Sequence, residues 1–235
     1  QGKLKLAIDS SQSSGSIAIS DQGRLLYSAF FDIRITHSET LMPTLDSAMK
    51  LCGFTPEDIE EISVCLGPGS FTGLRIGLAT AKGIAFARGI DVLGYNSLEL
   101  AAVPCLITGK RILTLIDAKM KELYAAAFDE KLNCIVSPRV ISPTDILDWD
   151  INSSILTGSA VPQVRELLED KGIMAEYAPD FMLVPKAELL FSLPAYLKPR
   201  VYSGLSLADL EPLYIRKSTA QIRAKRSVVQ PGSKA

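Results

Sequence analysis

Apolar and polar positions follow strand-like spacing at the start of the chain and then change to helix-like spacing. Three short apolar segments separated by polar turns predict a meander of three strands, Lys3–Asp9, Ser16–Ser20 and Leu25–Phe31. Apolar positions then recur at three- and four-residue intervals, which predicts a helix over Ser38–Cys52 that stops at Gly53. Pro43 places the start of this helix near Thr40 or bends the helix there.

The rest of the chain alternates between strand-like and helix-like segments. After a short helical start at Thr55–Asp58, we expect strands at Ile62–Leu66, Asp91–Tyr95, Arg111–Asp117, Glu122–Asp129 and Ile155–Thr157. We expect helices at Leu74–Arg88, Leu98–Leu106, Val161–Lys171 and Lys186–Leu197. A strand that ends in an acid and is followed by a hairpin partner occurs twice, at Asp9 and at Asp117. This repetition predicts two related lobes, of which the second is abbreviated.

The same pattern sets the expected domain boundaries. We expect an N-terminal, partner-binding lobe at residues 1–107, a smaller C-terminal lobe at 108–200, and a segment at 201–220 that packs back on both lobes. Residues 221–235 form a basic tail with little apolar content. A disordered tail is the expected state of such a composition, and an RNA-contacting arm is the alternative.

The helix Leu74–Arg88 has apolar residues on two opposite sides. One stripe contains Leu74, Leu78, Ala81 and Ala85, and the other contains Ile76, Ala79, Gly83, Phe86 and Ala87. A helix that lies on a sheet needs one apolar face, so two faces indicate burial inside the domain or against another chain. Small residues at Gly73, Gly77 and Ala81 would permit a close helix–helix approach.

Two polar stretches follow buried strands and are candidates for anion binding. Gly67–Gly73 combines glycines with a proline, and Ser70 or Thr72 can cap the next helix. Free backbone N–H groups at a helix start bind anions, although a turn shaped only for packing is an equal alternative. No P-loop lysine follows. Asp9-Ser10-Ser11 and Asp117 could hold a metal–nucleotide across a cleft, whereas a lone acid at a strand end is usually a turn residue.

Composition excludes several function classes for this chain of 235 residues. A net charge of −1 argues against a dedicated nucleic-acid coat or a membrane-surface protein. The four cysteines lack metal-ligand or redox spacing, and His37 is the single histidine, so neither a zinc site nor a hydrolase triad is indicated. We expect a cytoplasmic protein with reduced thiols, because no signal peptide and no apolar run of membrane-span length is present.

Several motifs together resemble the TsaB (YeaZ) family. They are Leu6–Ser11, His37–Leu41, Ile116–Lys119 and the specific stretch Gly67–Gly77, in order over about residues 4–128. Leu156–Ala160 and Glu211–Arg216 match more loosely. The resemblance implies an α/β protein of the actin-like ATPase fold (sugar kinase/Hsp70/actin, ribonuclease H-like), with two lobes and mixed sheets flanked by helices.

The resemblance also implies a function and a set of partners. Members are accessory, non-catalytic subunits required for threonylcarbamoylation of adenosine 37 in tRNA. They bind the TsaD transferase through helices of the N-terminal lobe, with the ATPase TsaE, form homodimers in isolation, and meet tRNA indirectly through the complex. Carried over with the helical stripes, the expected partner interface contains His37, Leu41, Met42, Leu45, Met49, Gly73, Leu74, Gly77, Leu78, Ala81, Lys82 and Ala85.

Departures from active enzymes of this fold argue against independent catalysis. Leu41 stands where a metal-binding HxxxH needs its second histidine, and Ser11 replaces a preferred glycine. The expected cofactor-contacting residues, vestigial or not, are Asp9, Ser10, Ser11, Gly69, Ser70, Thr72, Asp117 and Gly158. No cofactor is required by the chain alone in this interpretation, and ATP or ADP at the interface with TsaD stays open. The alternative function is an independent ATPase or small-molecule kinase.

Overall fold

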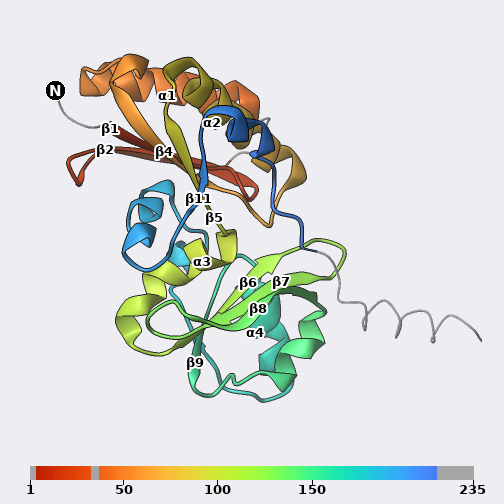
Figure 1. Ribbon diagram of the computed structural model, residues 1–235. Helices are drawn as coiled ribbons and strands as arrows, with labels where there is room; N and C mark the ends of the chain where they lie inside the picture. The colour runs from red at the N-terminus through yellow and green to blue at the C-terminus, as the bar shows by residue number, and fades with distance from the viewer. Residues whose placement is uncertain (1–3, 33–36, 216–235) are drawn as a thin grey trace, which may run out of the picture.

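The computed structural model describes the backbone of residues 4–32 and 37–215, which form two mixed sheets flanked by helices (Figure 1). The side chains of residues 32 and 37–39 fall outside the description. The first sheet has the order β11-β5-β4-β1-β2-β3. Its strands are β1 (Leu4–Asp9), β2 (Ser14–Asp21), β3 (Arg24–Asp32), β4 (Ile59–Cys65), β5 (Asp91–Tyr95) and β11 (Arg200–Tyr202).

The second sheet repeats the connectivity of the first. Its order is β10-β9-β6-β7-β8, built from β6 (Arg111–Asp117), β7 (Leu123–Phe128), β8 (Cys134–Ile141), β9 (Ser154–Thr157) and β10 (Glu176–Tyr177). Strand β1 is antiparallel to β2 and parallel to β4. Strand β6 is likewise antiparallel to β7 and parallel to β9. The duplication predicted from the acid-ended strands is confirmed, and this is the actin-like ATPase fold.

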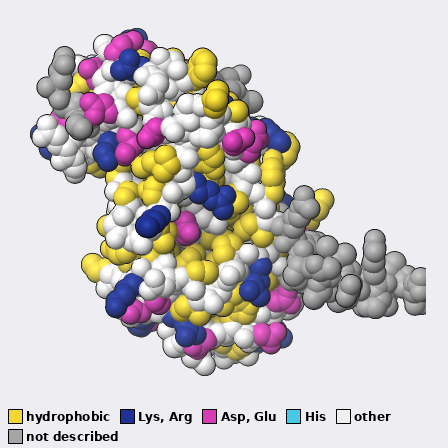
Figure 2. Space-filling view, in the orientation of Figure 1, with side chains coloured by type: hydrophobic (Ala, Val, Ile, Leu, Met, Phe, Trp, Pro, Cys, Tyr) yellow, Lys and Arg dark blue, Asp and Glu magenta, His cyan; other side chains and the backbone are white. Residues whose placement is uncertain are grey.

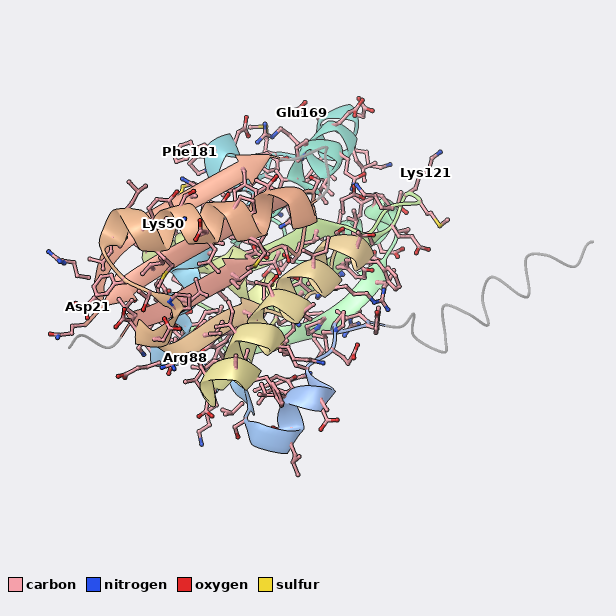
Figure 3. The ribbon with its side chains drawn as sticks, turned by 90° about the horizontal axis from the view of Figure 1, so that it is seen from above. Asp21, Lys50, Arg88, Lys121, Glu169 and Phe181 are labelled. Atoms are coloured by element: carbon pink, nitrogen blue, oxygen red, sulfur yellow. The ribbon has the colours of Figure 1, made fainter. Side chains whose placement is uncertain are left out.

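Two long helices cover one face of the first sheet. Figures 1 and 3 show α1 (His37–Cys52) and α2 (Phe71–Arg88) side by side on this face. Leu41, Leu45 and Met49 of α1 and Leu78 and Ala81 of α2 are buried in one core with the strands. Burial of these apolar stripes is what holds the helices on the sheet. No helix in the described part of the chain is long and apolar enough to cross a bilayer.

A second core lies between the sheets and behind the second sheet. Ala7 and Tyr95 of the first sheet join residues of β6, β7 and β9 in this cluster, together with α3 (Ser97–Ala102) and α4 (Val161–Asp170). Cys65 and Cys105 are also buried there, and burial raises the pKa of both thiols. All four cysteines are free, and Cys134 is exposed, unlike the other three.

The segment after the second sheet returns to the first. Strand β11 pairs antiparallel with β5, and the following 3₁₀ turn, η7 (Gly204–Asp209), contacts α2. Leu207 and Leu210 are buried in the first core. The Lys82 ammonium of α2 donates to the Ala208 carbonyl at 3.2 Å. The basic tail at residues 221–235 lies outside the described residues.

Prolines explain where the expected helices are wrong. The helix expected at Lys186–Leu197 is instead two 3₁₀ segments, η5 (Ala187–Phe191) and η6 (Leu193–Ala195), with Pro194 in the second. The helix expected at Leu98–Leu106 ends at Ala102 and continues as η2 (Val103–Thr108), which contains Pro104. A proline removes a backbone donor and obstructs the preceding turn, so the α-helical hydrogen bonds stop.

Two further expectations also needed correction. Helix α1 begins at His37, before the expected start near Thr40, and Pro43 sits inside it. Strand β8 was not predicted, because Pro138 and its polar neighbours interrupt the apolar pattern. It is an edge strand, where a proline is tolerated. The remaining 3₁₀ segments are η1 (Pro56–Asp58), η3 (Pro143–Asp148) and η4 (Asp180–Met182).

Candidate functional site

A cleft of about 530 Å³ lies between the two halves of the fold. One wall comes from the β1–β2 turn and the start of α2, and the other from the end of β6 and the β6–β7 turn. The cleft is lined by Ser11, Gln12, Ser13, Gly69, Ser70, Phe71, Thr72, Ile116, Asp117, Ala118, Lys119, Tyr124 and Ser159. About half of these side chains carry a hydroxyl or amide group, and apolar atoms make up the larger part of the accessible lining.

The first wall is held by hydrogen bonds that begin at the carboxyl end of β1. Asp9 is buried, and its Oδ1 accepts a hydrogen bond from the Ser11 backbone N–H at 2.9 Å. Ser10 is buried as well, and its hydroxyl donates to the Gly73 carbonyl at 2.7 Å. Asp9 and Ser10 therefore shape the wall from behind and do not line the cleft.

The glycine-rich stretch brings the start of α2 against the β1–β2 turn. The Ser70 backbone N–H donates to the Ser11 carbonyl at 2.6 Å, and the Ser70 hydroxyl accepts from the Gly73 N–H at 3.2 Å. A Cβ atom on Gly69 would lie 1.8 Å from the Ser11 carbonyl oxygen. Only glycine permits this approach, and Ser70 is confirmed as the helix cap.

Asp117 dominates the opposite wall, but its charge is already paired. Its carboxylate accepts from the Lys119 backbone N–H and lies 2.8 Å from the Lys119 ammonium. Partial burial raises the pKa of Asp117, yet the hydrogen bonds and charge of Lys119 outweigh this, and the net pKa is lowered. Asp117 is therefore an anion at neutral pH with an internal cation as partner.

Gly158 supports this wall from the rear. Its φ is +108°, and a Cβ atom there would lie 2.1 Å from the Leu115 carbonyl oxygen. The next residue, Ser159, accepts a hydrogen bond from the Asp117 backbone N–H at 3.3 Å. Gly158 thus permits β9 to turn beside β6 but does not line the cleft.

The cleft brings together part of the predicted cofactor-contacting set. Ser11, Gly69, Ser70, Thr72 and Asp117 line it, whereas Asp9, Ser10 and Gly158 lie behind its walls. Sequence reasoning missed the lining residues that neighbour these motifs, and their only signal was that adjacency. They are Gln12, Ser13, Phe71, Ile116, Ala118, Lys119, Tyr124 and Ser159.

These residues do not fit a site for a magnesium-bound nucleotide. Such a site needs carboxylates free to bind the metal or its water ligands. Asp9 is buried and is not among the residues that line the cleft, and Asp117 is paired with Lys119. Among the described residues, no cluster of three or more His, Cys, Asp or Glu side chains could hold a metal ion.

The predicted partner interface stays a prediction, but the structure buries most of its side chains within the chain itself. Nearly all of them pack inside the chain's own core and are absent from the surface, namely Leu41, Leu45, Met49, Gly73, Leu74, Gly77, Leu78, Ala81 and Ala85. Lys82 is half-buried and bonded to η7, and Met42 is 50% exposed. The side chain of His37 lies outside the described residues. A helix on a sheet buries its better-packed face, and periodicity could not say which stripe that was.

The other stripe of α2 faces solvent instead. Ala79, Gly83, Phe86 and Ala87 are exposed, and Phe86 is 80% exposed. Ile76 is half-buried beside them. Together these residues form a continuous apolar strip along the outer side of α2. We call it the exposed stripe, and it contains Ile76, Ala79, Gly83, Phe86 and Ala87.

Comparison with known proteins identifies close similarities. A family model described as TsaD, tRNA N6-adenosine threonylcarbamoyltransferase, matches residues 33–220. A Bacillus subtilis relative named tRNA threonylcarbamoyladenosine biosynthesis protein TsaB is 31% identical over 54% of this chain and 55% of its own length. The alignment therefore spans about half of that relative. The Haemophilus influenzae protein of the same name is 26% identical over 92% of this chain and 94% of its own.

Two other matches align over more of this chain or compare its fold. An uncharacterized Mycobacterium tuberculosis protein is 31% identical over 79% of this chain and 77% of its own length. The solved structure of YeaZ from Pseudomonas aeruginosa superposes with a TM-score of 0.74 at 24% identity, covering 91% of this chain and all of that one. At that identity the structural match shows a shared fold.

Proposed function

The chain belongs to the TsaB family of tRNA threonylcarbamoyladenosine biosynthesis proteins, within the wider family that the TsaD model describes, and from this premise we propose that it is a non-catalytic scaffold subunit. In this proposal it binds and activates the TsaD transferase, and TsaE joins the same assembly. The chain meets tRNA through that complex and works in the cytoplasm.

The observation that supports a scaffold role best is the exposed stripe of α2. Its opposite stripe is already buried, and within the exposed stripe Ile76 packs partly on the core whereas Phe86 is 80% exposed. Small residues at Ala79 and Gly83 lie one turn apart and allow a second helix to approach closely. Met42 is a further exposed apolar side chain, on α1, and α1 runs beside α2 (Figure 3). We propose this stripe in place of the interface expected from the sequence.

The same surface accounts for a homodimer when TsaD is absent. A helix stripe of this kind can pair with a second copy of itself about a two-fold axis. TsaD and the second copy would then compete for one surface. An equilibrium sedimentation measurement of the isolated chain, with and without TsaD, tests this competition.

The two acids at the cleft are poorly placed for independent catalysis. Asp9 is withdrawn behind the wall, and Asp117 is neutralised by Lys119, so magnesium-dependent phosphoryl transfer lacks its metal ligands. We propose that no cofactor is required by the chain alone. ATP or ADP bound at the interface with TsaD is compatible with this proposal, because the partner would supply the missing groups.

The decisive experiment adds a charge to the exposed stripe. Ala79→Arg should weaken binding to TsaD at least tenfold in calorimetric titration, because a charge would be desolvated in an apolar contact. Gln163→Arg places the same charge on an exposed position of α4 and should leave the affinity unchanged. Equal affinities for both variants would show that the stripe is not the interface.

The observation that favours the alternative function, an independent ATPase or small-molecule kinase, is the cleft with hydroxyl groups at the start of α2. Titration of the isolated chain with Mg·ATP separates the two functions. We expect no turnover of ATP by the chain alone. Micromolar binding with steady release of phosphate would favour the alternative.

A further inference from the structure

Three side chains form an exposed stack at the mouth of the cleft. The Arg75 guanidinium lies 3.3 Å from the centre of the Phe71 ring and donates to the Tyr214 hydroxyl at 2.9 Å. The two ring centres are 6.3 Å apart. Phe71 is 60% exposed and Tyr214 is 56% exposed, so their outer faces are open. We call Phe71, Arg75 and Tyr214 the aromatic platform.

The platform is built from segments that are far apart in the sequence. Phe71 and Arg75 stand on the first turns of α2, and Tyr214 follows η7 in the returning C-terminal segment. The Leu213 backbone N–H donates to the Leu66 carbonyl at 2.7 Å, which fixes this segment beside the first sheet. The contacts among Phe71, Arg75 and Tyr214 hold the two rings beside one guanidinium, an arrangement on which a further flat group can stack.

Across the cleft, the β6–β7 turn presents basic side chains. Lys119, Met120 and Lys121 have φ angles of 64°, 50° and 62°, a left-handed run without glycine. Met120 is 93% exposed, and Figure 3 shows Lys121 projecting into solvent, far from Arg88 at the C-terminal end of α2. This loop therefore points outward near the start of α2, where the platform stands.

The charges of the β6–β7 turn are of both signs, because Lys119 and Lys121 stand beside Asp117 and Glu122. Asp117 is the one acid among the residues that line the cleft, and Lys119 neutralises it. Figure 2 shows basic and acidic side chains interspersed over the face in view, so no large basic surface competes on that face.

We propose that the aromatic platform binds an unpaired nucleotide of an RNA strand. A base stacks on the open face of Tyr214 or on the outer plane of Arg75, the arrangement by which proteins hold unpaired bases. The adjoining phosphate lies toward the start of α2 and the Lys119–Lys121 loop. The inference goes beyond the scaffold function, which leaves RNA contact to the complex, and it rests on that function only for the choice of RNA.

Fluorescence anisotropy with the isolated full chain tests the proposal. The probe is a labelled single-stranded RNA oligonucleotide, and the same sequence as a complete duplex is the comparison. The single strand should bind more tightly, because only unpaired bases offer a free face. Tyr214→Ala and Phe71→Ala should each weaken single-strand binding about tenfold. Tyr214→Phe keeps the ring and should stay within about twofold of the unchanged chain.

Matched controls keep the outcome decisive. Phe181→Ala removes a ring that is 81% exposed and lies far from α2 in Figure 3, and it should leave RNA binding unchanged. Circular dichroism of each variant checks that it is folded. The proposal is overturned if the platform variants bind RNA as the unchanged chain does, or if Tyr214→Phe loses as much as Tyr214→Ala. It is also overturned if Mg·ATP, and not RNA, binds with this dependence.

A failure of the RNA test leaves the scaffold proposal standing, because TsaD binding is measured separately at the exposed stripe. Conversely, an Ala79→Arg variant that still binds TsaD would not change the RNA result. The two surfaces lie on the same helix but on different side chains, so each can be altered alone.

Discussion

At the residue scale, single atoms decide whether a position belongs to the site or to its support. Asp9 and Asp117 occupy equivalent strand ends, yet one is buried behind the wall and the other lines the cleft beside Lys119. Gly69 and Gly158 matter through the missing Cβ, because each lies against a backbone carbonyl. The chemistry of the cleft therefore depends on close backbone approach as much as on functional side chains.

Tyr95 gives a prediction at this scale. Its ring is buried and its hydroxyl has no hydrogen-bond partner among the described residues. A buried polar group without a partner destabilises the folded state. At neutral pH, Tyr95→Phe should therefore leave the free energy of unfolding unchanged or raise it by up to about 1 kcal/mol, as measured by urea denaturation. A loss of more than that amount would show that the hydroxyl makes a stabilising contact.

The same residue predicts a dependence on pH. Burial, and then the charges of Glu61 and Glu99, raise the pKa of Tyr95 from 10.0 to about 12. The unfolded chain releases this proton at a lower pH than the folded chain does. Stability is therefore fully present below pH 10 and falls as the pH rises toward 12, by about 2–3 kcal/mol in all. Urea denaturation of Tyr95→Phe near pH 11 should show a smaller alkaline loss than the unchanged chain.

At the element scale, α2 combines three tasks along one helix. Its inner stripe packs on the first sheet, its N-terminus forms one wall of the cleft, and its outer stripe faces solvent. Helix α1 supplies a second buried stripe, and Met42 is exposed among its described side chains that were expected to contact a partner. The apolar residues on the two sides of α2 therefore differ in role, because one side packs on the sheet and the other faces solvent.

Paired truncations of α2 test which stripe supports the fold. Leu78 is 3% exposed, so Leu78→Ala should lower the free energy of unfolding by about 2–5 kcal/mol. Phe86 is 80% exposed, so Phe86→Ala should change it by less than about 0.5 kcal/mol. Urea denaturation measures both. Similar losses in the two variants would mean that the outer stripe is also packed within the chain.

At the scale of the whole molecule, the returning C-terminal segment connects parts that are distant in sequence. Strand β11 extends the first sheet, Leu207 and Leu210 fill its core, and Tyr214 reaches the mouth of the cleft. The first half of the fold is thus completed by residues that follow the second half. Such a segment stabilises the fold by burying apolar area, in addition to any role at the cleft.

Two shortened chains test this dependence. A chain that ends after Pro199 loses β11 and the buried Leu207 and Leu210, and its thermal midpoint should fall by at least 10 °C for a loss of several kcal/mol. A chain that ends after Ile215 keeps all three and should unfold within a few degrees of the full chain. Equal midpoints for the two shortened chains would show that the returning segment contributes little stability.

Much of the architecture could be predicted because its signals are local. Alternation of apolar residues marked strand β1, and the acid ends of β1 and β6 exposed the internal repeat. The hydroxyls in the glycine-rich turn predicted a helix cap at Ser70 or Thr72, and the structure has the cap at Ser70. Helical expectations that ran through Pro104 or Pro194 were wrong, since the apolar pattern continued where the backbone could not.

The sequence by itself determined most of the elements, the duplicated topology, the glycine-rich cradle and the family. Those features depend on residue spacing and on backbone conformations that particular residues require. Only the tertiary structure decided which stripe of α2 is buried, that Asp117 is paired and Asp9 withdrawn, and that Tyr214 joins Phe71 and Arg75. These outcomes depend on which surfaces meet in three dimensions, and helical periodicity is the same for a face that meets the core as for one that meets water.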